Sequence, residues 1–164
     1  MAFSYICSAL EKRNLLSLIK SISGIRGTIG GKAGDGLSPE DVVQLTAAYA
    51  QWLKENSSLH KVVVGRDARV SGEMVNHLVL GTLVACGINV IDIGLSTTPT
   101  VEMAVPIEEA GGGIIITASH NPRQWNALKL LNDKGEFLSA EAGIRMMEIA
   151  AEGGIEYEKI EGLG

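Results

Sequence analysis

The chain has little positive charge, few cysteines and few aromatic side chains. Its 14 Lys and Arg are outnumbered by 19 Asp and Glu, which gives a net charge of −5. Such a balance offers no electrostatic reason to bind nucleic acid or an anionic membrane surface. Two cysteines, Cys7 and Cys86, are too few for a disulfide scaffold and indicate a reducing cytoplasm. Together with three scattered histidines they form no zinc-ligand pattern.

Long hydrophobic runs are also missing. No stretch approaches the length of a membrane span. Residues 3–10 are apolar, but Glu11, Lys12 and Arg13 follow them, whereas a secretory signal places its positive charges first. Residues 1–14 therefore read as an amino-terminal extension, expected to be loosely ordered or to form an extra helical turn, and they suggest no function.

What remains is an ordinary globular composition, with 46% hydrophobic and 20% charged residues among 164. That length suits one domain with a sizeable core. Apolar runs typical of strands alternate with helical patterns, which predicts an α/β fold: three α/β/α layers around a mixed, mostly parallel sheet of about four strands. A loop of about nine residues precedes the last strand, so that strand should return antiparallel. We expect the domain to span residues 15–154, and residues 155–164 to begin a linker.

The predicted elements are bounded by turn and cap signals. Strands are expected at 15–22, 61–65, 88–93, 113–117 and 127–131, and helices at 38–55, 71–87, 99–105 and 141–151. A glycine-rich loop is expected over residues 23–36, which hold six glycines.

The stretch from Gly113 to Pro122 carries the strongest chemical signal. Three successive isoleucines suit a strand buried on both faces, and Asn121-Pro122 then marks a turn. Ser119 is thus presented on a loop just beyond a rigid strand, where α/β proteins place their chemistry. The alternative is a serine that only satisfies backbone groups of the turn.

This stretch resembles the phosphoserine signature of the α-D-phosphohexomutases, the family of phosphoglucomutase and phosphomannomutase. Residues 117–122, Thr-Ala-Ser-His-Asn-Pro, match the signature at every position. Residues 126–129 resemble its Asn-Gly-x-Lys continuation, with Ala127 in place of glycine. Residues 23–27 look like its Gly-Ile-Arg-Gly loop, and residues 64–72 like its second loop. The four motifs occur in the same order as in the family, so the probability of a chance resemblance is very small.

The resemblance implies that Ser119 carries a phosphoryl group, gives it to one hydroxyl of a hexose phosphate and recovers another from the hexose bisphosphate so formed. It also implies Mg²⁺, with the phosphoryl oxygen on Ser119 as one ligand. The other ligands are expected outside this chain, because it contains no Asp-Gly-Asp loop and no carboxylate cluster with magnesium spacing.

Two basic residues are expected beside the serine. Lys129 lies just inside the returning strand, which brings its ammonium within reach of Ser119, and the resemblance gives it a part in proton movement there. Arg26, among glycines, could cradle phosphate oxygens together with backbone donors. The alternatives are a solvated strand lysine and a surface arginine in a mobile loop.

His120 and Asn121 complete the candidate set. Adjacent residues of an extended chain point apart, so His120 is expected to touch ligand or organise the loop rather than act as the base for Ser119. Asn121 is expected to contact phosphate or hold the loop by a side-chain hydrogen bond. Arg66, Asp67 and Arg69 form a polar knot that we expect to bridge loops or domains.

The family enzyme has four domains, and the resemblance covers only the first. We therefore expect a phosphoserine domain that needs the remaining domains of the same polypeptide and does not turn over alone. The preferred sugar is left open, because Ser23 and Ala127 depart from the family pattern. Phosphoglucosamine mutase is the nearest neighbour and is kept as the alternative. A free-standing phosphate-binding module is the other class of function. A serine hydrolase is excluded, since its elbow needs glycines where Thr117 and Asn121 stand.

Overall fold

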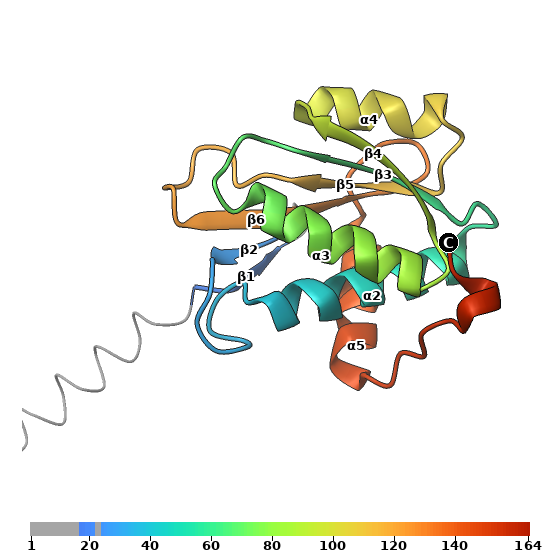
Figure 1. The fold of residues 1–164 in the computed structure, drawn as a ribbon, viewed down its shortest axis with the longest axis horizontal. Helices are drawn as coiled ribbons and strands as arrows, with labels where there is room; N and C mark the ends of the chain where they lie inside the picture. The colour runs from blue at the N-terminus through green and yellow to red at the C-terminus, as the bar shows by residue number, and fades with distance from the viewer. Residues whose placement is uncertain (1–16, 22–23) are drawn as a thin grey trace, which may run out of the picture.

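The computed structural model describes residues 17–21 and 24–164. They form a six-stranded mixed sheet in the order β1-β2-β6-β5-β3-β4, with helices on both faces (Figure 1). The predicted three-layer α/β class is confirmed, although the sheet has six strands rather than about four. The predicted extension, residues 1–14, lies outside the described residues.

The strands are β1 Ile19–Ser21, β2 Gly24–Thr28, β3 Lys61–Arg66, β4 Asn89–Leu95, β5 Gly112–Ile116 and β6 Trp125–Leu131. The helices are α2 Pro39–Asn56, α3 Gly72–Ala85, α4 Thr98–Ile107 and α5 Ala140–Glu152, followed by the short 3-10 helix η1 Ile160–Gly162.

The strands at the centre of the sheet run in the predicted directions relative to one another. Strand β3 pairs in parallel with β4 and β5, since a helix connects each strand to the next. All five residues of β5 are buried, as expected for a strand covered on both faces. Strand β6 pairs antiparallel with β5, which confirms the predicted return.

The expected glycine-rich loop is partly a strand. Residues Gly24–Thr28 form β2, which pairs antiparallel with β1 and β6. Ile25 lies in the core with 2% of its surface exposed. The glycine at 27 permits close packing rather than a turn, because a Cβ there would lie 2.7 Å from the backbone nitrogen of Leu37. Arg26 therefore extends from a strand, and its backbone is committed to the sheet.

Helix α2 begins as the sequence predicts. The Ser38 side chain accepts a hydrogen bond from the backbone of Asp41, and the Asp41 carboxylate accepts one from the backbone of Ser38. This capping box satisfies donors that the first helical turn leaves unpaired. One face of α2 is buried in the core, with Tyr49 and Leu53 fully covered.

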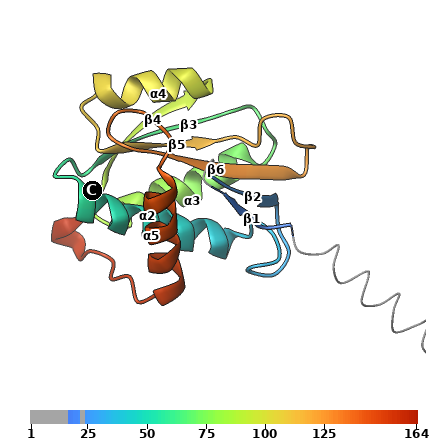
Figure 2. The ribbon, with the colours of Figure 1, turned by 180° about the vertical axis from the view of Figure 1, so that it is seen from behind.

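Each face of the sheet has its own core. Helices α2, α3 and α5 cover one face, and α4 lies on the other, over the half of the sheet formed by β4, β3 and β5 (Figures 1 and 2). Val101 and Val105 of α4 pack there with Ile115 and Leu131. Because α4 packs against β3 and β5, polar side chains of β2 and β6 have room on this face.

The carboxy-terminal residues return to the domain. The Glu158 and Gly164 backbone nitrogens donate to the carbonyls of Ala85 and Val84 at the end of α3. Glu158 also pairs with Lys54 of α2 at 2.7 Å. That residues 155–164 begin a linker stays a prediction.

Among the described residues, no helix is both long enough and apolar enough to cross a membrane.

Two buried acidic groups make stability sensitive to alkaline pH. Burial raises the pKa of the Cys86 thiol above its ordinary 9.0 and that of the Tyr49 hydroxyl above its ordinary 10.0. Since both pKa values are raised on folding, the unfolded chain loses these protons first. Their stabilisation is complete below pH 9 and falls above it, by about 1.4 kcal/mol per pH unit for each group that ionises only when unfolded.

Urea unfolding between pH 8.5 and 10.5 measures this loss. We expect Cys86→Ala to flatten the decline that begins near pH 9, and Tyr49→Phe to flatten the part above pH 10. A double variant with the same slope as the parent chain would contradict the assignment.

Candidate active site

Ser119 lies on the loop that follows β5 and is exposed. Its φ of +52° falls in the left-handed region, which non-glycine residues seldom occupy and which costs of order 1–3 kcal/mol. Its backbone nitrogen donates to the Thr117 hydroxyl at 3.0 Å. The exposed hydroxyl and the unusual backbone fit a side chain that is presented rather than packed.

Lys129 is in contact with this serine. Its Nζ donates to Ser119 Oγ at 3.2 Å, so the predicted approach of the two residues is confirmed. The ammonium also lies 5.7 Å from the centre of the Phe137 ring, a cation–π distance. Phe137 follows the turn after β6, and sequence reasoning missed it because only the folded turn brings it back to Lys129.

Arg26 faces the same space from the neighbouring strand. It pairs with Ala127, two residues before Lys129 on β6, and residues two apart on a strand share a face. Arg26 Nε is buried and has no hydrogen-bond partner. A buried donor without a partner is costly, and an anion entering this space would satisfy it.

These side chains line one cavity of about 180 Å³. His120 and Asn121 also line it, so the structure brings together all five predicted site residues. His120 is exposed. The Asn121 side chain donates to the Ala118 carbonyl at 2.8 Å, which is the predicted loop-holding bond. The cavity walls also include Ser21, which lies outside the four motifs, and Gly24, Thr117 and Ala118, which lie within them.

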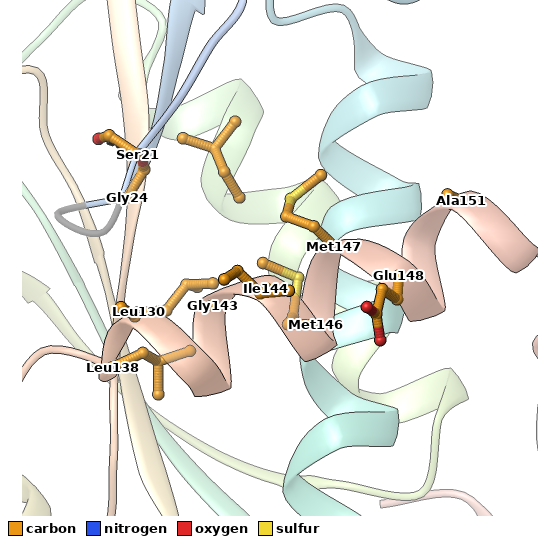
Figure 3. Close-up of a pocket in the computed structure, with 12 residues that line it drawn as sticks. Ser21, Gly24, Leu130, Leu138, Gly143, Ile144, Met146, Met147, Glu148 and Ala151 are labelled. Atoms are coloured by element: carbon orange, nitrogen blue, oxygen red, sulfur yellow. Dashed lines mark hydrogen bonds between the residues drawn. The ribbon is translucent and has the colours of Figure 1, made fainter.

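A larger cavity of about 450 Å³ lies on the opposite face of the sheet, between α5 and strands β1, β2 and β6 (Figure 3). Side chains such as Leu138, Ile144, Met146 and Met147 give it an apolar lining. The phosphorylated sugar that the resemblance implies needs donors and positive charge, so the smaller, basic cavity is the candidate site.

The described residues do not complete a magnesium site. No group of three His, Cys, Asp or Glu residues within 17–21 and 24–164 could hold a metal ion. The carboxylate of Asp67, which the fold brings to the serine loop, already accepts hydrogen bonds from Thr117 and Arg69.

Fold and site together define an α/β/α domain that presents a serine hydroxyl to two basic side chains beyond the end of a buried strand. Residues 18–154 match the family described as phosphoglucomutase/phosphomannomutase, alpha/beta/alpha domain I. The chain belongs to the phosphoglucomutase/phosphomannomutase family, as the resemblance predicted.

Individual relatives agree with the family match. A phosphoglucomutase/phosphomannomutase of Thermococcus kodakarensis is 42% identical over 118 residues, covering 70% of this chain and 26% of that protein. A phosphoglucosamine mutase of Helicobacter pylori is 38% identical over 127 residues, covering 76% and 28%. A crystal structure of a family protein from Burkholderia thailandensis superposes with a TM-score of 0.72 at 23% identity, covering 86% and 32%, which shows the shared fold. The chain spans about a quarter of the length of these curated relatives.

Proposed function

We propose that this chain is the phosphoserine-bearing first domain of a hexose-phosphate mutase. The complete enzyme moves phosphate between the 1- and 6-positions of a sugar through a sugar bisphosphate. Ser119 carries the phosphoryl group, and Lys129, Arg26, His120 and Asn121 surround it. The observation that carries the proposal is the 3.2 Å contact between Lys129 Nζ and Ser119 Oγ in a cavity that also receives Arg26.

The residues have separate parts in the transfer. The bond from phosphorus to Ser119 Oγ breaks as a bond to a sugar hydroxyl oxygen forms. Lys129 stabilises and protonates the departing Oγ, and it accepts that proton again when the serine is rephosphorylated. The proton of the attacking sugar hydroxyl passes to a base of the remaining domains, which returns it to the sugar oxygen that departs in the second transfer. Arg26 binds phosphoryl oxygens through its unpartnered Nε. His120 and Asn121 contact the phosphate or sugar from the loop.

Parts of this machinery lie outside the described residues. A phosphoryl group on Ser119 would supply one ligand to Mg²⁺, which would add positive charge there, and the other ligands would come from the remaining domains. The first domain alone does not turn over. A cytoplasmic location is also part of the proposal, in keeping with the free thiol of Cys86.

The sugar is a hexose phosphate, with glucosamine phosphate as the second candidate. Relatives of similar identity are named for both substrates, at 42% and 38%. A different class, a phosphate-binding module without catalysis, would keep the basic cavity and lose phosphorylation of Ser119. The chemical state of this one residue therefore separates the two classes.

Intact-mass analysis of the longest natural polypeptide that contains this chain, purified from cells, tests the proposal. We expect a population heavier by one phosphoryl group, and its complete loss in Ser119→Ala. Ser58→Ala, at an exposed loop serine, is the matched control and should keep the added mass. If the parent protein lacks the added mass, or if Ser119→Ala keeps it, Ser119 is not the phosphoryl carrier.

A further inference from the structure

One arginine from another loop holds the whole serine loop. Arg69 follows β3 and lies 50 residues before Ser119 in the sequence. Its Nη2 donates to the carbonyls of Ser119 at 2.6 Å and Asn121 at 2.8 Å. Its Nη1 donates to those of Pro122 at 2.9 Å and Trp125 at 3.0 Å.

These bonds leave the guanidinium no free donor. Its Nε donates to Asp67 Oδ2 at 3.2 Å, which with the four carbonyls accounts for the five N–H groups of an arginine. Only 12% of the Arg69 side chain is exposed. Arg69 cannot bind a phosphate without giving up a loop carbonyl, unlike Arg26, whose Nε is unpartnered.

Asp67 orients a second contact on the same serine. The Thr117 hydroxyl donates to Asp67 Oδ2 at 2.5 Å, which leaves its oxygen free to accept from the Ser119 backbone nitrogen at 3.0 Å. The two polar groups of the Ser119 backbone are thus both held, the N–H through Thr117 and Asp67 and the C=O through Arg69. These bonds oppose the strain of the left-handed φ at Ser119.

We propose that Arg69 and Asp67 are positioning residues, which keep Ser119 in its left-handed conformation so that Oγ faces Lys129 and the basic cavity. The inference rests on the proposed function only in that Ser119 is the phosphoryl carrier. In this proposal, Arg69 binds neither substrate nor phosphoryl group, because its five donors are taken by Asp67 and the loop carbonyls. It sets where the reacting oxygen is.

The geometry demands arginine in particular. A lysine offers three donors from one point, whereas the planar guanidinium reaches four carbonyls and a carboxylate at once. Arg69→Lys therefore keeps the positive charge but loses most of the hydrogen bonds to the four loop carbonyls, which together we call the Arg69 clamp. Asp67→Asn and Thr117→Val remove the other half of the support with little change in side-chain size.

Solution NMR of the unphosphorylated chain tests the inference. The one-bond Cα–Hα coupling of Ser119 distinguishes positive from negative φ, and amide exchange reports the bond to Thr117. In Arg69→Lys we expect the coupling to move to that of a negative φ and the Ser119 amide to exchange roughly tenfold faster or more, the factor for losing about one hydrogen bond. Asp67→Asn should shift both in the same direction. Arg145→Lys, on a half-exposed side chain with ion pairs at 3.6 Å, is the matched control and should leave both unchanged.

A purely structural role predicts something else. If Arg69→Lys and Asp67→Asn lower the melting temperature while Ser119 keeps its coupling and exchange rate, the inference is wrong. Should Arg69→Lys fail to fold, Asp67→Asn and Thr117→Val decide on the same two readouts. The chain carries no phosphate in this experiment. A negative NMR result would therefore not contradict the phosphorylation of Ser119. In the same way, absence of phosphate on Ser119 would not contradict the positioning role of Arg69 and Asp67.

Discussion

Lys129→Met is expected to lower kcat by about 10²–10³-fold in a complete polypeptide that contains this chain, as when one charged donor is removed from a preorganised site. The ammonium that contacts Ser119 Oγ at 3.2 Å is lost, so in the proposed mechanism the departing serine oxygen would be neither stabilised nor protonated. Methionine keeps an unbranched stem beside Phe137. KM should change little, because the contact is to the transferring oxygen rather than to the sugar.

Steady-state turnover of hexose phosphate by the purified variant provides the measurement. Lys134→Met is the matched control, since Lys134 lies exposed in the turn after β6, and its kcat should equal that of the parent. An unchanged kcat in Lys129→Met would show that the contact with Ser119 is incidental.

Gly112→Ala is expected to destabilise the domain by about 3 kcal/mol, the upper part of the usual range for overpacking a core. A Cβ at this position would collide with the hydroxyl of Tyr49 and lie 2.7 Å from the carbonyl oxygen of Leu131. That hydroxyl donates to the same carbonyl at 2.7 Å, so the new methyl group also displaces a buried hydrogen bond. For a domain of this size the melting temperature should fall by roughly 6–12 °C.

Thermal unfolding checks the size of the effect. Gly81→Ala is the control: nothing lies within 4 Å of its added Cβ, and this helical glycine should gain stability when replaced. Removing the Tyr49 hydroxyl relieves one of the two collisions, so Gly112→Ala combined with Tyr49→Phe should be more stable than the sum of the two single changes predicts. Strictly additive effects would contradict the proposed collision.

Much of the fold can be predicted from the sequence, because the local preferences of the residues for helix or strand agree with their packing in the folded domain. Ser38-Pro39-Glu40-Asp41 carries both halves of a capping box, and α2 begins there. Three consecutive isoleucines can satisfy two apolar faces only in a central strand, and β5 is fully buried. The short loop before β6 allows only an antiparallel return, and that return brings Lys129 to Ser119.

The misses have a common physical cause. Gly24 and Gly27 signal flexibility by composition, whereas their actual role is close approach between backbones, which depends on distant partners such as Leu37 and Leu128. Arg69 donates hydrogen bonds to backbone carbonyls, and every residue has one, so the sequence does not show which residues accept these bonds. Thr117 serves as an acceptor only once Asp67 is beside it. Such contacts are set by tertiary arrangement rather than by local pattern.

The pairing of β2 with β6 has a consequence for synthesis on the ribosome. Ile25 of β2 pairs with Leu128 of β6. About a hundred further residues must therefore be synthesised before β2 can pair with β6. At ordinary elongation rates the wait lasts roughly 5–20 s. A nascent chain can thus complete the parallel strands β3, β4 and β5 before the cavity that holds Arg26 and Lys129 exists, and this cavity forms only when β6 has left the exit tunnel.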